Sequence, residues 1–551
     1  MFKHVAVSQL VALLVASSVC AQNTSIPIVV PDDAKPLPQN LLGFSIEQDR
    51  WPDWAGTHAR NNFTHDALAN YAHLTGKPPH IRVGANTEDH TIWSPTVTIE
   101  SADFPPPNTI TPYPEATRVV VGDEYYALSR FLPAGKYPVG THMTWGINLG
   151  LDNATNAMNM ANSILRAFSS AAVQAAGVVL DLLEIGNEPD LYKNNGLRPS
   201  NWTVQQYVAD WINISTPVAQ AIESQPLEAG PVAIQAASFA GQGFTPRQIF
   251  SLGILNSVPG KLVTTISQHR YSAAFCSGGD FPLTSFMSKA NVRGNLTVFR
   301  DDIEATLMQG LPYILGETGS IACHGAPGVS NTAGAALWVI DYTLQAATQD
   351  ISEVLFHEGV GFKYNFIQPV TLNRSTIDGS PLTPPEQPHI QPSYYAGLFI
   401  NTFIGSSGNT QISELTVWDD NVSGYAAYEH GKLVRAAFVN LDAWLVSSVG
   451  LRPSVHVNPI LYWSQDGSTT NTTGGSVNAN AAEAAWKHEK VNAKRIIINH
   501  ADDVQNLTWA GQSWEKTGDV RPTGRLVVEK VDLAKGFDLR STEAILLEFT
   551  P

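Results

Sequence analysis

Two glutamates constrain the fold of this chain more than any other feature, because each stands where a short apolar strand should end. Glu188 follows the apolar segment 177–180 and precedes Pro189, which cannot donate to a strand ladder and so ends the pairing. Glu317 follows the apolar segment 312–316 in the same way. Residues this far apart in sequence meet only if the fold brings parallel strand ends together. A (β/α)8 TIM barrel does so, since its catalytic groups lie at the C-terminal ends of its strands.

Up to about residue 405, short apolar strands alternate with helical stretches, which is the pattern of a parallel α/β domain. The predicted strands are 42–47, 80–84, 139–149, 178–184, 233–238, 262–269, 313–317 and 353–357. Eight strands are the number that a closed barrel needs. Helices are predicted at 334–349 and 392–404. Glu188 then ends the fourth strand and Glu317 ends the seventh.

In the last quarter of the chain the helical pattern fades, and short alternating strands indicate an all-β sandwich. These strands are predicted at 413–418, 424–429, 433–440, 455–463, 495–499, 526–530 and 544–549. Segment 464–482, rich in Ser, Thr, Gly and Asn, predicts a loop. The strand-like segment 24–30 should add an edge strand to the sandwich. We therefore predict a catalytic barrel over 36–405 and a sandwich built from 22–35 and 406–551.

Residues 1–21 have the features of a secretory signal peptide, with a weakly basic start, an apolar middle and small residues before a cut near Gln22. No later segment approaches the roughly 20 continuous apolar residues that cross a bilayer. Ten Asn-X-Ser/Thr sequons fit a glycoprotein. They begin at Asn23, Asn62, Asn153, Asn201, Asn213, Asn295, Asn373, Asn421, Asn471 and Asn506. We expect a secreted, extracellular protein that does not bind a membrane.

The formal net charge of −16 and the pI of about 5.3 argue against a nucleic-acid partner, and no basic run offsets them. An anionic substrate must then be held by local groups, because the overall field does not attract it. The sequence shows no zinc-type spacing of Cys and His and no Gly-rich phosphate loop, so no metal and no organic cofactor is expected. No obligate protein partner is evident either.

Two cysteines, Cys276 and Cys323, remain after removal of the leader. Each follows a predicted barrel strand, and neighbouring strands place their loops together. This favours one disulfide in an oxidising compartment, with two free buried thiols as the alternative.

Two carboxylates at barrel strand ends suit retaining glycoside hydrolysis, which needs them roughly 5–5.5 Å apart. Glu317 should be the nucleophile, kept ionised by Arg82 on the second strand; Arg82 could equally belong to a structural ion pair. Glu188 should be the general acid/base. Asn187 can hydrogen-bond the sugar hydroxyl next to the reacting carbon. Tyr271 either donates to Glu317 and orients it or is a core aromatic.

Further motifs resemble one family. The Asn-Glu-Pro sequence at 187–189, together with Glu317 on strand seven, looks like clan A of the glycoside hydrolases. Within that clan, a set of segments is similar to family 79, which contains β-glucuronidases and heparanase. The segments are 316–320 (GETGS), 325–332 (GAPGVSNT), 336–338 (ALW), 44–47 (FSIE), 81–84 (IRVG) and 399–405. The likeness covers most of the chain after the leader, including the sandwich.

The resemblance implies a retaining β-glucuronidase in which Glu188 is the acid/base and Glu317 the nucleophile. It also implies that Glu47 and Asn86 bind the outer hydroxyls of the sugar. The family holds the uronate carboxylate with tyrosines and backbone amides beyond strands seven and eight, which assigns Tyr364 to the carboxylate.

The chain departs from the family beyond strand seven. Where relatives carry Tyr followed by Gly, this chain has Ala322, Cys323 and His324. One carboxylate ligand is therefore missing, and His324, Lys363 or Arg270 is expected to replace it.

Heparanase-like cleavage inside a sulfated chain would need clustered Lys and Arg, and the sequence shows none. An exo-acting enzyme on small or branched β-glucuronides fits better, with 4-O-methyl-glucuronides of plant arabinogalactan as further substrates. Another clan A activity, such as β-xylosidase or β-glucosidase, is the alternative among enzymes. The alternative outside the enzymes is a carbohydrate-binding protein that keeps the fold without catalysis. Such a protein should lack one of the two carboxylates, and this chain has both.

Overall fold

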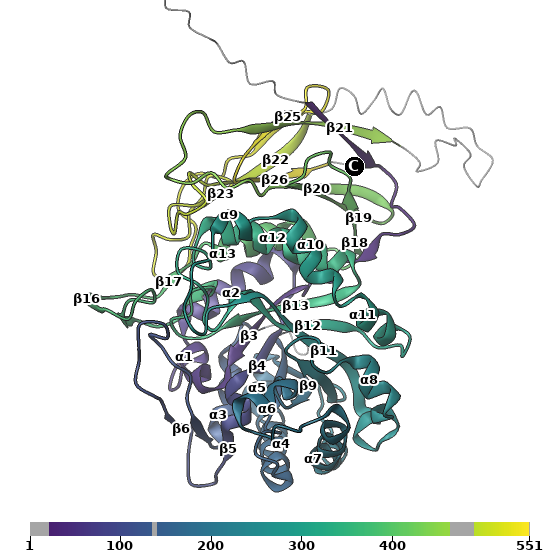
Figure 1. Ribbon diagram of the computed structural model, residues 1–551, viewed down its shortest axis with the longest axis vertical. Helices are drawn as coiled ribbons and strands as arrows, with labels where there is room; N and C mark the ends of the chain where they lie inside the picture. Colours follow the sequence, from purple (N-terminus) through teal and green to yellow (C-terminus); the bar gives the residue numbers. More distant parts are fainter. Residues whose placement is uncertain (1–20, 135–139, 463–489, 550–551) are drawn as a thin grey trace, which may run out of the picture.

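The computed structural model describes residues 21–134, 140–462 and 490–549, and places a barrel below a β-sandwich (Figure 1). Residues 1–20 of the expected leader and the expected loop at 464–482 lie outside the described residues. Among the described residues, every helix is too short or too polar to traverse a bilayer.

Eight parallel strands close into the barrel, which confirms the predicted fold. In order around the ring they are β3 (Leu42–Glu47), β4 (Ile81–Gly84), β8 (His142–Ile147), β9 (Val179–Ile185), β10 (Ala233–Phe239), β11 (Val263–Ala274), β12 (Tyr313–Ala322) and β13 (Ile351–Glu358). Two of them run past their predicted ends, β11 to Ala274 and β12 to Ala322. The extensions pair with each other, Tyr271 with Gly319 and Ala273 with Ile321, so a neighbouring strand satisfies backbone groups that the sequence assigned to loops.

Helices connect successive barrel strands and surround the barrel. The helices are α1 (Trp51–Ala55), α2 (Asn62–Thr75), α3 (Asp123–Ala127), α4 (Ala154–Phe168), α5 (Ala171–Ala176), α6 (Tyr192–Asn195), α7 (Val204–Ser224), α8 (Pro246–Ser251), α9 (Leu283–Phe286), α10 (Lys289–Thr297), α11 (Arg300–Leu307), α12 (Ala333–Thr348) and α13 (Ser393–Ile404). Local chemistry sets their ends: the Asn61 side chain accepts from the backbone N–H of Phe63 and Thr64 at the start of α2, and Gly76 ends it in the left-handed conformation. The helices predicted at 334–349 and 392–404 are α12 and α13.

Two insertions lie beyond the C-terminal ends of barrel strands. A small sheet of β5 (Thr91–Trp93), β6 (Glu100–Asp103) and β7 (Arg118–Val121) follows β4. The hairpin of β15 (Leu372–Arg374) and β16 (Pro381–Glu386), beside the pair β14 (Ile367–Gln368) and β17 (His389–Ile390), follows β13. Tyr113, in the loop between β6 and β7, joins the two insertions: its hydroxyl donates to the carbonyl of Arg374 and accepts from its N–H.

The sandwich has two sheets. The large sheet contains β2 (Lys35–Pro36), β18 (Thr410–Leu415), β19 (Val422–Glu429), β20 (Lys432–Asn440), β26 (Glu543–Glu548), β22 (Lys490–Ile497), β23 (Thr508–Trp509) and β24 (Glu529–Asp532). The small sheet contains β1 (Ala21–Pro27), β21 (Ser454–Tyr462) and β25 (Phe537–Arg540), with β1 as a parallel edge strand on β21. The strand predicted at 413–418 is wrong at its end, because Trp418 is 74% exposed beyond β18.

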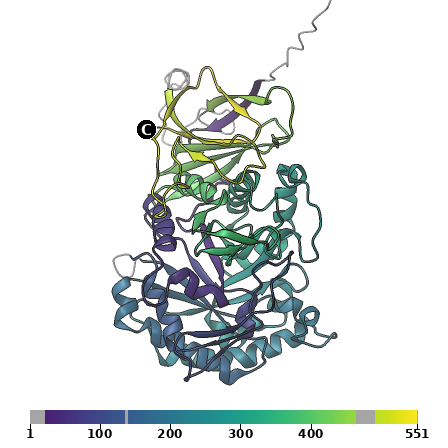
Figure 2. The ribbon, with the colours of Figure 1, turned by 90° about the vertical axis from the view of Figure 1, so that its left-hand side faces the viewer.

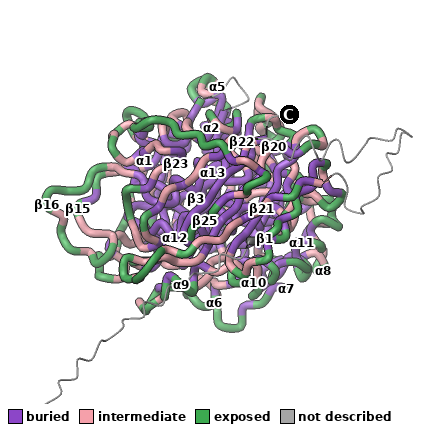
Figure 3. The backbone as a smooth tube through the Cα atoms, turned by 90° about the horizontal axis from the view of Figure 1, so that it is seen from above, coloured by how far each residue is buried: buried purple, intermediate pink, exposed green. Residues whose placement is uncertain are grey.

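Alternate residues of the large sheet belong to different apolar cores. Tyr425, Ala437 and Leu546 face the barrel and join its core through α12 and α13. Phe438 and Leu547 face the small sheet and form a separate core with it. Figure 2 shows the sandwich standing on the barrel, and Figure 3 shows the buried backbone continuing through the middle of the molecule. The side of the barrel that carries α12 and α13 is therefore covered by the sandwich and is not exposed to solvent.

Candidate active site

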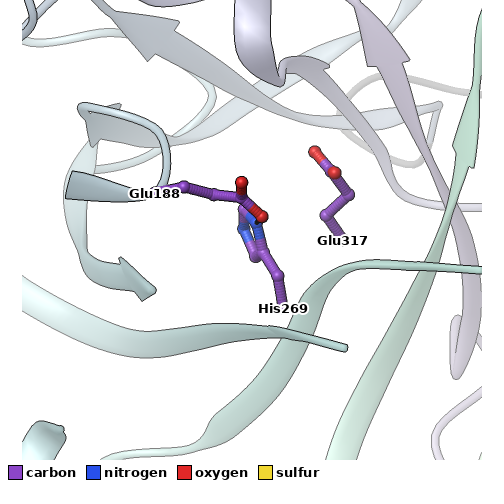
Figure 4. Close-up of side chains that lie close together, drawn as sticks. All are labelled: Glu188, His269 and Glu317. Carbon is purple, nitrogen blue, oxygen red and sulfur yellow. Dashed lines mark hydrogen bonds and ion pairs between the residues drawn. The ribbon is translucent and has the colours of Figure 1, made fainter. Parts of the chain in front are cut away.

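Glu188 and Glu317 come from different barrel strands, and the structure brings their carboxylates together (Figure 4). A carboxylate oxygen of each lies within 4.8 Å of the other and of a ring nitrogen of His269. Glu188 follows β9 and Glu317 lies within β12. The expected meeting of two remote acids at the C-terminal end of the barrel is therefore present.

Glu188 is held in an unusual backbone conformation. Its φ of 49° lies in the left-handed region, which costs a non-glycine residue roughly 1–3 kcal/mol. Pro189 disfavours the right-handed helical region for the residue before it. Two hydrogen bonds fix the turn: the N–H of Glu188 donates to the Ser238 carbonyl at 2.9 Å, and the N–H of Leu191 donates to the Glu188 carbonyl at 2.8 Å. The side chain is 22% exposed, so a substrate can reach it.

Glu317 is surrounded by groups that stabilise its anion. Arg82 Nη1 donates to Oε2 at 2.8 Å, the Tyr271 hydroxyl donates to Oε1 at 2.8 Å, and His357 Nδ1 lies 3.3 Å from Oε1. Burial alone would raise the pKa of Glu317, but the charges of His357, His269 and Arg82 more than offset it and lower the pKa to about 2. Glu317 is therefore a carboxylate at any ordinary pH.

Arg82 serves both functions that the sequence left open. It is fully buried and donates to Glu184 at 2.8 Å, as a structural ion pair would, while it also contacts Glu317. A further N–H donates to the side-chain oxygen of Asn187 at 2.8 Å. Because that oxygen is taken, the amide nitrogen of Asn187 is the atom left to donate to a sugar hydroxyl.

Two histidines complete the site, and the sequence reasoning missed both. His269 Nδ1 lies 3.0 Å from Glu188 Oε1, and His269 is two residues before Tyr271, so period-two alternation along β11 gives both the same face. His357 ends the predicted eighth strand, a position that also pointed to the site. Burial lowers the pKa of His357, but Glu317, Glu47 and Glu115 outweigh it and raise the pKa to about 9.

Tyr364 and Glu47 lie around His357. The Tyr364 hydroxyl is 3.1 Å from His357 Nδ1, and His357 Nε2 is 3.4 Å from Glu47 Oε1. Glu47 is fully buried, and its oxygens accept from the N–H groups of Asn86 and Thr87 and from the Thr87 hydroxyl. Burial and the Glu115 charge raise the pKa of Glu47 against the effect of His357.

His324 is the one of the three expected replacement ligands that lies beside this cluster. Its Nε2 is 2.8 Å from Glu115 Oε1, and its ring stacks on Phe362 with centroids 3.8 Å apart. Arg270 points the other way, donating to Asn295 on α10 at 2.6 Å. Lys363 is fully buried with its ammonium 5.6 Å above the ring of Phe275. Asn295 therefore holds Arg270 away from the cluster, whereas the buried Lys363 ammonium has no hydrogen-bond partner among the described residues.

Cys276 and Cys323 are joined in a disulfide, with Cα atoms 5.1 Å apart. The bond links the segment after β11 to the segment after β12. Cys323 and His324 both have positive φ, 61° and 69°, so the disulfide anchors the strained turn that presents the His324 ring.

Among the described residues, Glu188, His269 and Glu317 form the one group of acidic and imidazole side chains found to converge as metal ligands would. The guanidinium of Arg82, 2.8 Å from Glu317, already supplies a positive charge there and would repel a metal ion. The arrangement instead offers one stabilised carboxylate and one partly exposed acid close together, which suits nucleophilic attack assisted by proton transfer.

Known proteins resemble this chain in sequence and fold. Residues 424–546 match the profile of the glycosyl hydrolase family 79 C-terminal beta domain. A beta-glucuronidase of Aspergillus niger is 30% identical over 513 residues, covering 88% of this chain and 85% of that protein. A beta-glucuronidase of Neurospora crassa is 27% identical, covering 93% and 91%. The crystal structure of a 4-O-alpha-L-rhamnosyl-beta-D-glucuronidase from Fusarium oxysporum superposes with a TM-score of 0.73 at 22% identity, covering 96% of this chain and 100% of that one.

Proposed function

The chain belongs to glycoside hydrolase family 79, and from this premise we propose that it is a secreted, exo-acting β-glucuronidase that retains the configuration of the anomeric carbon. One observation carries the mechanism: oxygens of Glu188 and Glu317 lie within 4.8 Å of each other. Inverting enzymes separate their carboxyl groups by roughly 6.5–9.5 Å to admit a water molecule, and retaining enzymes by roughly 5–5.5 Å. The short separation supports direct attack by Glu317.

The reaction takes two steps. The Glu317 carboxylate attacks the anomeric carbon while protonated Glu188 gives its proton to the glycosidic oxygen, so the bond to the aglycone breaks and a glycosyl ester forms. Glu188, now a carboxylate, then takes a proton from water, and the water oxygen displaces Glu317. His269, 3.0 Å from Glu188, orients the acid in both steps.

Substrate recognition rests on groups around these two acids. Asn187 donates to the 2-hydroxyl, where contacts strengthen in the transition state. Tyr364 and His324 hold the uronate carboxylate, and Asn86 binds an outer hydroxyl. The contact between His324 and Glu115 joins the loop after β12 to the loop before β7. These joined loops close the site at the end of the sugar that is far from the scissile bond. This closed end supports exo action.

Secretion and glycosylation are supported by two features. The disulfide between Cys276 and Cys323 is typical of an oxidising compartment. Several sequon asparagines, including Asn62, Asn201 and Asn213, are exposed on the described surface.

A panel of p-nitrophenyl β-D-glycosides tests the substrate class. We expect the glucuronide to be cleaved with a kcat/KM at least roughly 100-fold above those of the glucoside and xyloside, since the latter lack the group that Tyr364 and His324 bind. Tyr364→Phe should weaken the glucuronide far more than the glucoside. Equal rates across the panel would favour another clan A glycosidase.

Two variants test the catalytic roles. Glu317→Gln should lower kcat by at least roughly 1,000-fold and leave the thermal unfolding midpoint near that of the wild type. Glu188→Ala should slow substrates with poor leaving groups most, and azide should restore turnover and yield a β-glycosyl azide. An α-azide product would refute retention through Glu317.

A further inference from the structure

The barrel strand β10 contains a bulge near its C-terminal end. Ala237 pairs with Ser267 of β11 and Phe239 pairs with the residue after Ser267, so Ser238 is an extra residue between two pairs. Both Ala237 and Ser238 have positive φ, 78° and 50°. Two successive non-glycine residues in the left-handed region are unfavourable unless the surrounding structure holds them there. None of the proposed catalytic steps uses a residue of this bulge.

The Ser238 side chain is anchored inside the barrel. Ser238 is buried, and its hydroxyl donates to Glu184 Oε2 at 2.7 Å. The other oxygen of Glu184 accepts from Arg82 Nε at 2.8 Å, and Arg82 Nη1 donates to Glu317. Glu184 is therefore bonded to Ser238 on one side and, through Arg82, to the proposed nucleophile on the other.

The Ser238 backbone contacts the proposed acid/base. The pairing of β10 with β9 ends three residues before Ser238, and the Ser238 carbonyl accepts instead from the N–H of Glu188 at 2.9 Å. Because Glu188 has a φ of 49°, this bond stabilises a backbone conformation that is unfavourable for the residue alone. One chain of hydrogen bonds therefore joins the two proposed catalytic acids, through Arg82, Glu184 and Ser238.

The hydroxyl of Ser238 explains how a serine can occupy this position. Glycine would adopt the positive φ without a steric cost, but it has no side chain to donate to Glu184. Ser238 offsets the cost of its conformation with a hydrogen bond to a charged acceptor, which belongs to the stronger class of such bonds. The hydroxyl, and not the backbone preference of serine, therefore holds the bulge.

We propose that Ser238 is a positioning residue for the acid/base: its hydroxyl, anchored on Glu184, holds the bulge so that its carbonyl fixes the turn that carries Glu188. This inference rests on the proposed function. A shift of about 1 Å in a catalytic group can slow a reaction on the order of 100-fold. Loss of the anchor should therefore impair proton donation by Glu188 more than attack by Glu317.

The test compares two aryl β-D-glucuronides in the wild type and in Ser238→Ala. Phenol is a poor leaving group that needs a proton, whereas 2,4-dinitrophenolate leaves without one. We therefore expect kcat/KM to fall at least roughly 30-fold for the phenyl glucuronide and less than roughly threefold for the dinitrophenyl glucuronide. The matched control is Ser267→Ala, which removes another buried hydroxyl, one without a hydrogen-bond partner among the described residues. This control should leave the ratio of the two rates unaltered.

A second variant, Ser238→Gly, separates the hydroxyl from the backbone conformation. Glycine accepts the positive φ, so this variant should fold even if Ser238→Ala does not. It should show the same selective loss on the phenyl glucuronide, because it also lacks the donor to Glu184. A wild-type ratio of rates in Ser238→Gly would overturn the inference, since the conformation alone would then be sufficient.

The outcomes separate this inference from the proposed function. A wild type that cleaves neither glucuronide overturns the proposed function, and the inference falls with it. A wild type that cleaves both, while the Ser238 variants slow both substrates by the same factor, overturns only the inference. Ser238 would then support the fold of the barrel without positioning the acid.

Discussion

His357 connects Glu317, the proposed nucleophile, to Glu47 in the outer part of the site. Its Nδ1 lies 2.8 Å from the Tyr271 hydroxyl and 3.3 Å from Glu317, and its Nε2 faces Glu47. An imidazolium in this position offsets the negative charge of the carboxylates around it. Without that cation, the buried acids would repel each other and the incoming uronate.

The raised pKa of His357 makes a prediction about pH. The folded protein binds this proton more tightly than the unfolded chain, whose histidines titrate near 6.5, so the stabilisation is complete below pH 6.5 and is lost as the pH rises through about 9. The thermal midpoint of the wild type should therefore fall between pH 6.5 and 9. The thermal midpoint of His357→Asn should be lower than that of the wild type at pH 6, and it should fall less than that of the wild type between pH 6 and pH 9.5. The matched control is exposed His58→Asn, which should keep the wild-type profile; an unchanged profile in His357→Asn would contradict the assignment.

Glu188, Glu317 and Arg82 could be predicted from the sequence pattern alone, whereas Asn86, His324 and Tyr364, outside the strands, were named only through the family resemblance, and Glu115 was not named at all. Glu188, Glu317 and Arg82 each follow or lie within an apolar run, so their placement needs only the barrel. Glu115 sits in a Pro-rich loop with no period to read, and only long-range contacts with Asn86 and His324 bring it to the site. A single sequence carries no local signal for such contacts.

The disulfide joins the segments that follow the two longest barrel strands, β11 and β12. Each cysteine was correctly predicted to follow a strand, but the predicted strands ended before the observed ends of β11 and β12, because Gly319 and the polar residues around it are typical of a turn. Pairing between the extensions was missed for the same reason. A strand end depends on its neighbour as well as on its own residues.

Removing this disulfide should affect both stability and binding. With the cysteines separated by 47 residues, loss of the cross-link costs roughly 4 kcal/mol in the chain-entropy account. The double variant Cys276→Ser/Cys323→Ser should lower the free energy of unfolding by about 2–4 kcal/mol. It should also raise KM for the glucuronide more than it lowers kcat, because His324 follows Cys323. Urea unfolding and steady-state kinetics measure the two effects, and a variant with wild-type KM would show that the bond does not position His324.

Some sequon asparagines are exposed to solvent, whereas others are hydrogen-bonded to the rest of the protein. The side chain of Asn421 accepts from the N–H of Lys289 at 2.9 Å and donates to the Met287 carbonyl and to Asp442. A glycan on its amide nitrogen would break the contact between barrel and sandwich. Asn201 and Asn213 lie exposed.

If the protein is secreted, glycopeptide mass spectrometry should find sugar on Asn201 and Asn213 and none on Asn421. Asn201→Gln should remove the mass of one glycan without a change in the unfolding midpoint. Asn421→Gln should leave the glycan mass unchanged and lower the midpoint, since its hydrogen bonds are lost. Sugar found on Asn421 in active enzyme would contradict this division.

We expect the barrel to need the sandwich in order to fold, because α12 and α13 are buried between the two. The Tyr425 hydroxyl donates to Asp341 Oδ1 at 2.6 Å, and Asp341, on α12, is itself fully buried. A chain ending at Gly405 would expose the apolar faces of both helices, so it should be insoluble or aggregated in size-exclusion chromatography. Asp341 would lose the Tyr425 hydroxyl and keep its ion pair with Arg293. The milder variant Tyr425→Phe removes one hydroxyl and should cost about 1–3 kcal/mol in urea unfolding while keeping wild-type kcat. A soluble, active protein ending at Gly405 would show instead that the barrel core is complete on its own.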